Sequence, residues 1–153
     1  MDVHDRIERK VLLKAPHERV WQALIEAEQF GSWFGIDLKG KQFVAGEAIA
    51  AQITFPGYEH VKWNARIERL EPQKLFSFSW HPYAIEEGID YDSETPTLVE
   101  FALEDHTEGT LLRVVESGFL AIPQARREKA FKMNSRGWDE QMNNIEVHLT
   151  KSP

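Results

Sequence analysis

The chain closes with PQARREKAFKMNSRGWDEQMNNIEVHLT (residues 123–150), which reads as one long amphipathic helix. Its apolar residues recur at helical spacing, with charged residues between them. The apolar residues are Ala130, Phe131, Trp138, Met142, Ile145 and Leu149. Pro123 fits the first turn, where a backbone N–H has no partner within the helix. We therefore predict a single long helix from Pro123 onward.

The rest of the chain is predicted to be mainly strands. A first strand carries Ile7, Val11 and Leu13, and two short helices follow from Pro16 and over 28–34, ending at Gly35. From there to Gly118 the apolar residues alternate in steps of two, broken by turn signals such as Pro56-Gly57. The alternating sets are Ile49, Ala51, Ile53 and Phe55; Val61, Trp63, Ala65 and Ile67; Phe76, Phe78 and Trp80; Val99, Phe101 and Leu103; Leu112 and Val114.

This order predicts an α+β helix-grip fold. A curved antiparallel sheet of about six to seven strands would wrap around the long C-terminal helix, with two short helices after the first strand. We find no repeat or linker, so residues 1–153 are predicted to form one domain. One helix cannot fill the whole concave side of such a sheet. We therefore expect a cavity that holds something apolar.

The composition narrows the function classes. The 153 residues carry a formal charge of −7 with no basic run, which argues against nucleic acid and anionic membranes as partners. Cysteine is absent, so disulfides and thiolate chemistry are excluded. The polar N-terminus and the lack of a run of about 18 apolar residues indicate neither a signal peptide nor a membrane span. We predict a cytoplasmic protein without a cofactor.

Several short motifs occur in the order found in a known family: Ala15-Pro16, Val20-Trp21, Leu24, Trp33-Phe34-Gly35, Ala45-Gly46, Trp80, Gly109-Thr110, Glu116-Ser117-Gly118-Phe119 and Gly137-Trp138. Together they resemble the bacterial homologues of the activator of heat-shock protein 90 ATPase, within the SRPBCC (START-like) superfamily. The resemblance spans nearly the whole chain. It implies the helix-grip fold and a cavity, but members differ widely in ligand and activity.

The alternation and the helical spacing also predict which residues line that cavity, and their aromatic character favours a flat, apolar or aromatic ligand. The candidates are Trp33, Phe34, Phe55, Trp63, Phe78, Trp80, Phe101, Phe131, Ser135, Trp138 and Met142. For Trp33 and Phe34 we favour a role as core plugs over a place at the cavity mouth. Gly137 costs about 1 kcal/mol within a helix. It either admits a ligand or lets the helix approach the sheet, and we favour the close approach.

Polar groups near this wall are the weak catalytic candidates. Glu116 continues the inward alternation of the last strand, where burial would raise its pKa and suit acid–base work. We favour the alternative that Glu116 meets solvent or an arginine, because acids are rarely buried unpaired. His81 and Tyr83 flank Pro82 beside Trp80 and are expected at the pocket rim.

The acidic segment 86–94 imitates a calcium loop only at its start. Thr95 stands where the turn glycine belongs, and Phe101 where the closing glutamate belongs. We predict a solvated loop, a lid or a dimer contact here, and no metal site.

Three functions remain open. The first is non-catalytic binding of a small hydrophobic or aromatic molecule, and the second is a polyketide cyclase or dehydratase-like enzyme that uses polar groups in the same cavity. The third is a chaperone-interaction module, as the resemblance suggests. The eukaryotic activator has a further N-terminal chaperone-docking domain with no counterpart in this sequence. We favour the binder, with a homodimer open.

Overall fold

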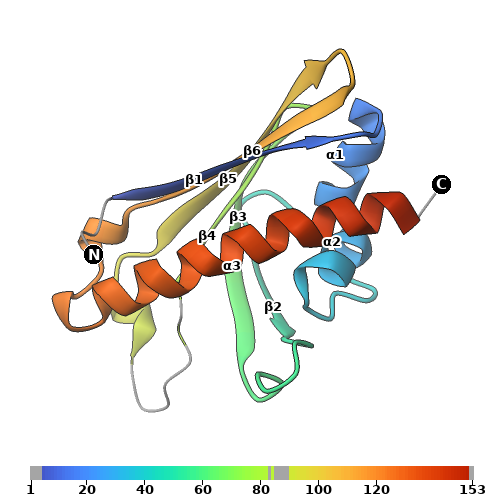
Figure 1. Ribbon diagram of the computed structural model, residues 1–153. Coiled ribbons are helices and arrows are strands. Elements are labelled where there is room, and N and C mark those ends of the chain that lie inside the picture. Colours follow the sequence, from blue (N-terminus) through green and yellow to red (C-terminus); the bar gives the residue numbers. More distant parts are fainter. Residues whose placement is uncertain (1–4, 83, 85–89, 152–153) are drawn as a thin grey trace.

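The computed structural model describes residues 5–82, 84 and 90–151. Six strands form one antiparallel sheet in the order β1-β6-β5-β4-β3-β2, and three α-helices accompany it (Figure 1). The elements are β1 (Arg6–Leu13), α1 (His17–Ile25), α2 (Ala27–Phe34), β2 (Ala48–Gln52), β3 (Lys62–Glu71), β4 (Leu75–Trp80), η1 (Tyr91–Ser93), β5 (Thr97–His106), β6 (Gly109–Ser117), η2 (Phe119–Ala121) and α3 (Gln124–Lys151). The predicted helix-grip fold is confirmed.

The long helix α3 crosses one face of the curved sheet, and its C-terminal end lies beside α1 and α2 (Figure 1). Its apolar stripe is buried, as the spacing predicted, from Ala130 to Ile145. Pro123 lies just before the helix, and its carbonyl oxygen accepts the backbone N–H groups of Arg126 and Arg127. Pro123 therefore precedes the first turn that we predicted it to occupy, and it accepts hydrogen bonds from that turn.

Helices α1 and α2 fill one end of the concave face. Phe30 of α2 is fully buried and meets the rings of Phe76, Phe78 and Phe101 edge-on, with ring centroids 5.8–6.2 Å apart. Edge-to-face packing of this kind is favoured between aromatic rings. Helix α2 ends at Phe34, and Gly35 follows in the left-handed conformation, with a φ of 98°, that glycine adopts readily at a helix end. The aromatic core therefore lies under α2, at one end of the concave face of the sheet.

One predicted strand is shorter than its alternation suggested. The pattern from Ile49 to Phe55 indicated a strand over the whole run, but β2 ends at Gln52. Ile53 makes only an isolated bridge with Ile36. Phe55 belongs to the turn between β2 and β3, where its side chain is 55% exposed. The Pro56-Gly57 turn begins early enough to pull Phe55 out of the sheet.

Candidate functional site

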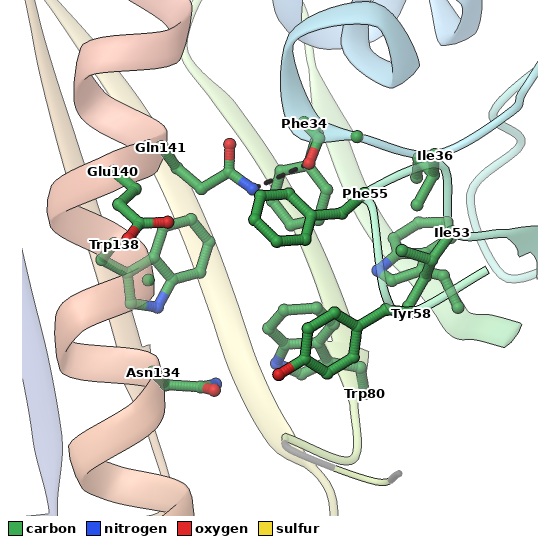
Figure 2. Close-up of a pocket in the computed structure, with 13 residues that line it drawn as sticks. Phe34, Ile36, Ile53, Phe55, Tyr58, Trp80, Asn134, Trp138, Glu140 and Gln141 are labelled. Atoms are coloured by element: carbon green, nitrogen blue, oxygen red, sulfur yellow. Dashed lines mark hydrogen bonds between the residues drawn. The ribbon is translucent and has the colours of Figure 1, made fainter. Parts of the chain in front are cut away.

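A hollow of about 230 Å³ lies between α3, the C-terminal end of α2, the turn between β2 and β3, and strands β3 and β4. Figure 2 shows Asn134 and Trp138 projecting from α3 toward the rings of Phe55, Tyr58 and Trp80 on the opposite wall. The lining is mostly apolar and consists of Phe34, Gly35, Ile36, Ile53, Phe55, Tyr58, Trp63, Trp80, Asn134, Gly137, Trp138, Glu140 and Gln141.

Six aromatic side chains surround this cavity. Phe34 is central to the set, because its ring lies 6.0–6.2 Å from the rings of Trp63, Trp80 and Trp138. The plane of Phe34 is inclined to each of these rings by 53–62°, so Phe34 forms a parallel wall with none of them. Phe34 also stacks on Phe30, with centroids 4.7 Å apart. The cavity wall is therefore continuous with the aromatic core.

The predicted lining residues divide into two groups. Phe34, Phe55, Trp63, Trp80 and Trp138 line the cavity. Trp33 is buried instead, and its indole donates to the carbonyl oxygen of Ala23. The two rings that were expected to share one role thus separate, with Trp33 a core plug and Phe34 a wall. Four further candidates are buried outside this lining, namely Phe78, Phe101, Phe131 and Met142.

Ser135 lies elsewhere than expected. Its hydroxyl and its carbonyl oxygen both accept from the guanidinium of Arg9 on β1, which also donates to Asp139. Ser135 therefore belongs to a polar contact between α3 and the edge strand β1. One position along the helix, Asn134 is on the cavity side.

Gly137 faces open space, which contradicts the close approach we favoured from sequence. A Cβ atom placed on Gly137 would have no neighbour within 4 Å apart from the helix itself. The residue lines the cavity, so its missing side chain is part of the hollow. Gly137 therefore lowers the stability of the helix without allowing a closer contact between the helix and the sheet.

Glu116 of β6 is fully buried, and this overturns the solvent or arginine contact we favoured for it. Its carboxyl group accepts four hydrogen bonds from neutral donors. Oε2 accepts from the indole of Trp80 at 2.7 Å and the hydroxyl of Thr97 at 2.6 Å. Oε1 accepts from the amide of Asn134 and the indole of Trp138, both at 2.8 Å. The alternation was right about the direction of this side chain.

The Glu116 carboxyl group joins the sheet to the helix beneath the cavity. Three of its donors, Trp80, Asn134 and Trp138, also line the cavity. An indole N–H can only donate, so a carboxyl oxygen of Glu116 is the acceptor in both tryptophan hydrogen bonds. Buried networks of this kind hold their members in one arrangement when every group is satisfied. The carboxyl group therefore fixes the orientation of two walls of the cavity.

Burial raises the pKa of Glu116 above its ordinary value of 4.5, although the four hydrogen bonds oppose the shift. A raised native pKa favours folding fully below the unfolded pKa, and this contribution is lost as the pH rises through the native pKa. Glutamine cannot titrate. We therefore expect the free energy of unfolding of the wild type, minus that of Glu116→Gln, to fall as the pH rises above about 4.5.

Urea denaturation of both proteins at a series of pH values measures this difference, in which the titration of other groups largely cancels. A difference that rises with pH would show that the hydrogen bonds outweigh burial and that the native pKa is lowered instead.

One further polar side chain, that of His81, lies near the cavity. His81 lines a second hollow of about 380 Å³, which shares Ile53, Trp63 and Trp80 with the first. Its Nε2 lies 4.0 Å from Asp92, and it is not among the donors to Glu116. Tyr83 lies outside the described residues. The structure therefore does not bring His81 and Glu116 into one hydrogen-bonded set.

Trp63 carries a buried donor without an acceptor. Its indole N–H has no hydrogen-bond partner within the described part of the chain, although the side chain lines both hollows. Buried polar groups are rarely left unpaired in native proteins. The nitrogen atom itself is buried, so Trp63 lines the hollows with its ring carbons and not with this donor.

The acidic segment is partly anchored. Glu86 and Glu87 lie outside the described residues, but Glu94 is paired with Arg126 at 2.6 Å and both side chains are largely buried. Arg126 also donates to the carbonyl oxygen of Pro82 and lies over the ring of Tyr91. No group of three acidic or histidine residues suited to a metal ion occurs in the described ranges.

The cavity residues missed from sequence come from two places. Ile36 and Tyr58 lie at or beside turns, where no periodicity marks a direction. Asn134 and Gln141 share a helix face with Trp138, at spacings of four and three residues. That spacing was a usable signal for the helix side of the cavity.

No helix in the described part of the chain has the length and apolar character needed to cross a membrane. A comparison with curated protein sequences finds no match. Solved structures share the fold. Protein MLL2253 from Mesorhizobium loti has a TM-score of 0.74 at 19% identity, covering 97% of this chain and 98% of that one. A protein from Arthrobacter aurescens also has a TM-score of 0.74, at 18% identity, covering 97% of this chain and 87% of that one.

DynU16, described as a protein in the dynemicin biosynthetic locus, has a TM-score of 0.71 at 18% identity. The alignment covers 97% of this chain but 48% of DynU16. The family described as "Activator of Hsp90 ATPase homolog 1-like protein" matches residues 14–150. With its six-stranded sheet gripping α3, the chain therefore belongs to this family, within the SRPBCC (START-like) superfamily.

Proposed function

We propose that this protein binds a small apolar or aromatic molecule in the cavity between the sheet and α3, without chemical turnover. The observation that carries the proposal is the hollow of about 230 Å³ walled by six aromatic side chains. Apolar walls with a few polar groups are typical of small-molecule sites.

Binding is favoured over a cyclase or dehydratase activity by the state of Glu116. This carboxyl group is the strongest acid–base candidate, but all four of its hydrogen bonds go to the protein. It lies behind Trp80 and Trp138 and is not among the lining residues. A general acid or base must reach the proton that it transfers. No contact or surface in the described residues specifically favours the chaperone-interaction alternative.

We also propose a cytoplasmic location, which the acidic, cysteine-free composition supports.

Titration with naphthol, a flat aromatic alcohol, tests the proposal. We expect saturable quenching of tryptophan fluorescence with one site per chain, and a thermal midpoint that rises with naphthol concentration. Phe55→Ala removes an exposed wall ring and should weaken binding by about three- to tenfold. Leu120→Ala is the matched control, since Leu120 is 52% exposed on η2 and Phe55 is 55% exposed. Equal affinities in the two variants, or no binding at all, would count against this cavity as the site.

A further inference from the structure

The shape of the aromatic wall points to a compact ligand group. Trp80 and Trp138 are inclined by 46° with centroids 6.2 Å apart, and Phe34 is inclined to each of them by more than 50°. A flat ring is held best between parallel walls, and none of these three ring pairs is parallel. A roughly spherical group in the cavity would contact several of these rings at once.

The charges around the cavity favour a cation. None of the lining residues is a lysine, arginine or histidine, and Glu140 contributes a carboxylate at the rim. Glu140 is exposed and makes no ion pair or hydrogen bond with any described residue. The chain as a whole carries a formal charge of −7. A positively charged group would therefore meet a favourable charge at the rim of this cavity.

The buried carboxyl group strengthens the same preference. It accepts the indole N–H groups of Trp80 and Trp138, which are two of the walls. A hydrogen bond from an indole N–H to a carboxyl oxygen draws the proton away and leaves more electron density on the ring. Cations are attracted to the faces of electron-rich rings, and most strongly to tryptophan. Glu116 thus makes two wall rings better partners for a cation without touching the ligand.

We propose that the cavity recognises an alkylated ammonium group, of the trimethylammonium type, as the head of its ligand. This inference rests on the proposed ligand-binding function and narrows it to one chemical class. The methyl groups of such a cation provide the apolar surface that the walls require. Its charge is spread and weakly hydrated, so the cost of removing it from water is small compared with that of a primary ammonium.

Calorimetric titration with two matched probes separates shape from charge. The first is choline, and the second is the neutral alcohol in which a tert-butyl group replaces the trimethylammonium group of choline. The two have nearly the same size and shape. We expect choline to bind about tenfold more tightly. Equal or tighter binding of the neutral alcohol would overturn the inference while leaving the cavity as an apolar binding site.

Glu140→Gln tests the charge of the rim without disturbing a contact within the described protein. We expect it to weaken choline binding by about three- to fivefold and to leave binding of the neutral alcohol unchanged. Glu146→Gln is the control, since Glu146 is an exposed glutamate on the same helix outside the cavity lining. An equal loss for both probes in Glu140→Gln would contradict a charge-based role.

Naphthol serves as the third probe and distinguishes the two levels of the proposal. Binding of naphthol without binding of choline overturns the ammonium inference and keeps the ligand-binding function. Failure of all three probes overturns both.

Discussion

Replacement of Glu116 by leucine is expected to lower the free energy of unfolding by roughly 3–5 kcal/mol. Leucine is close to glutamate in size, so the change removes the acceptor while largely preserving the volume. Four donors from β4, β5 and α3 would then lose their partner in a buried site. A buried donor without an acceptor costs about 1–3 kcal/mol, and entering water would recover part of the sum. Urea denaturation measures the loss.

Glu104→Leu provides the matched comparison for this prediction. Glu104 lies on the neighbouring strand β5 with its side chain exposed, and its replacement should change the stability by less than about 0.5 kcal/mol. If both variants had the same small effect, the carboxyl group would not be the junction that its hydrogen bonds indicate. A stabilised Glu116→Leu protein would show that the cost of burying the carboxyl group exceeds the value of its four hydrogen bonds.

Gly137→Leu is expected to weaken ligand binding by about 100-fold or more, which corresponds to about 2.7 kcal/mol. Its side chain would extend into the open space in front of α3 and occupy volume that the ligand requires. The fold should tolerate the change, since leucine favours a helix by most of the roughly 1 kcal/mol that glycine costs. Naphthol titration and thermal denaturation of the same samples measure the two effects.

Gly137→Ala is the control for the backbone effect. Its methyl group would meet no atom outside the helix within 4 Å, so binding should change little while the helix gains up to about 1 kcal/mol. Unchanged affinity in Gly137→Leu would show that the ligand does not occupy this hollow. Destabilisation by both variants would instead indicate a closer contact between α3 and the sheet than the structure has.

The sequence patterns predicted the fold well because each element has a strong period of its own. The alternation in β3, β5 and β6 puts one set of side chains inside, and the spacing from Ala130 to Ile145 puts one face of α3 on them. These patterns arise from local geometry, which every residue of an element shares. The end of β2 was predicted less accurately, because the apolar Phe55 continues the alternation past Gln52 into a turn.

The candidate site was harder to predict because it depends on residues that are far apart in the chain. Glu116 was assigned the right direction, but its partners lie 18 to 36 residues away and on both sides of it in the sequence. No pattern shows that two indoles, an amide and a hydroxyl meet at one carboxyl group. The expectation of a solvent or arginine contact followed from the general cost of burying acids, which here is offset by neutral donors.

The same limit applies to the cavity. Phe78 and Phe101 share the inward alternation with Trp63 and Trp80, so sequence alone cannot separate the two pairs. Phe30 of α2 packs on Phe78 and Phe101, which are fully buried, and also on Trp63, whose ring still reaches the hollow together with Trp80. The position of α2 over the sheet decides which rings are core and which are wall.

The junction at Glu116 also determines how a molecule can reach the cavity. If α3 moved away from the sheet, Asn134 and Trp138 would lose their hydrogen bonds to the carboxyl group of Glu116. The buried acid would then keep only half of its partners. Movement of the turn between β2 and β3 breaks none of those four bonds. Phe55 and Tyr58, whose rings lie 5.9 Å apart, border the cavity on this turn, so we expect a ligand to enter on this side while α3 keeps its place.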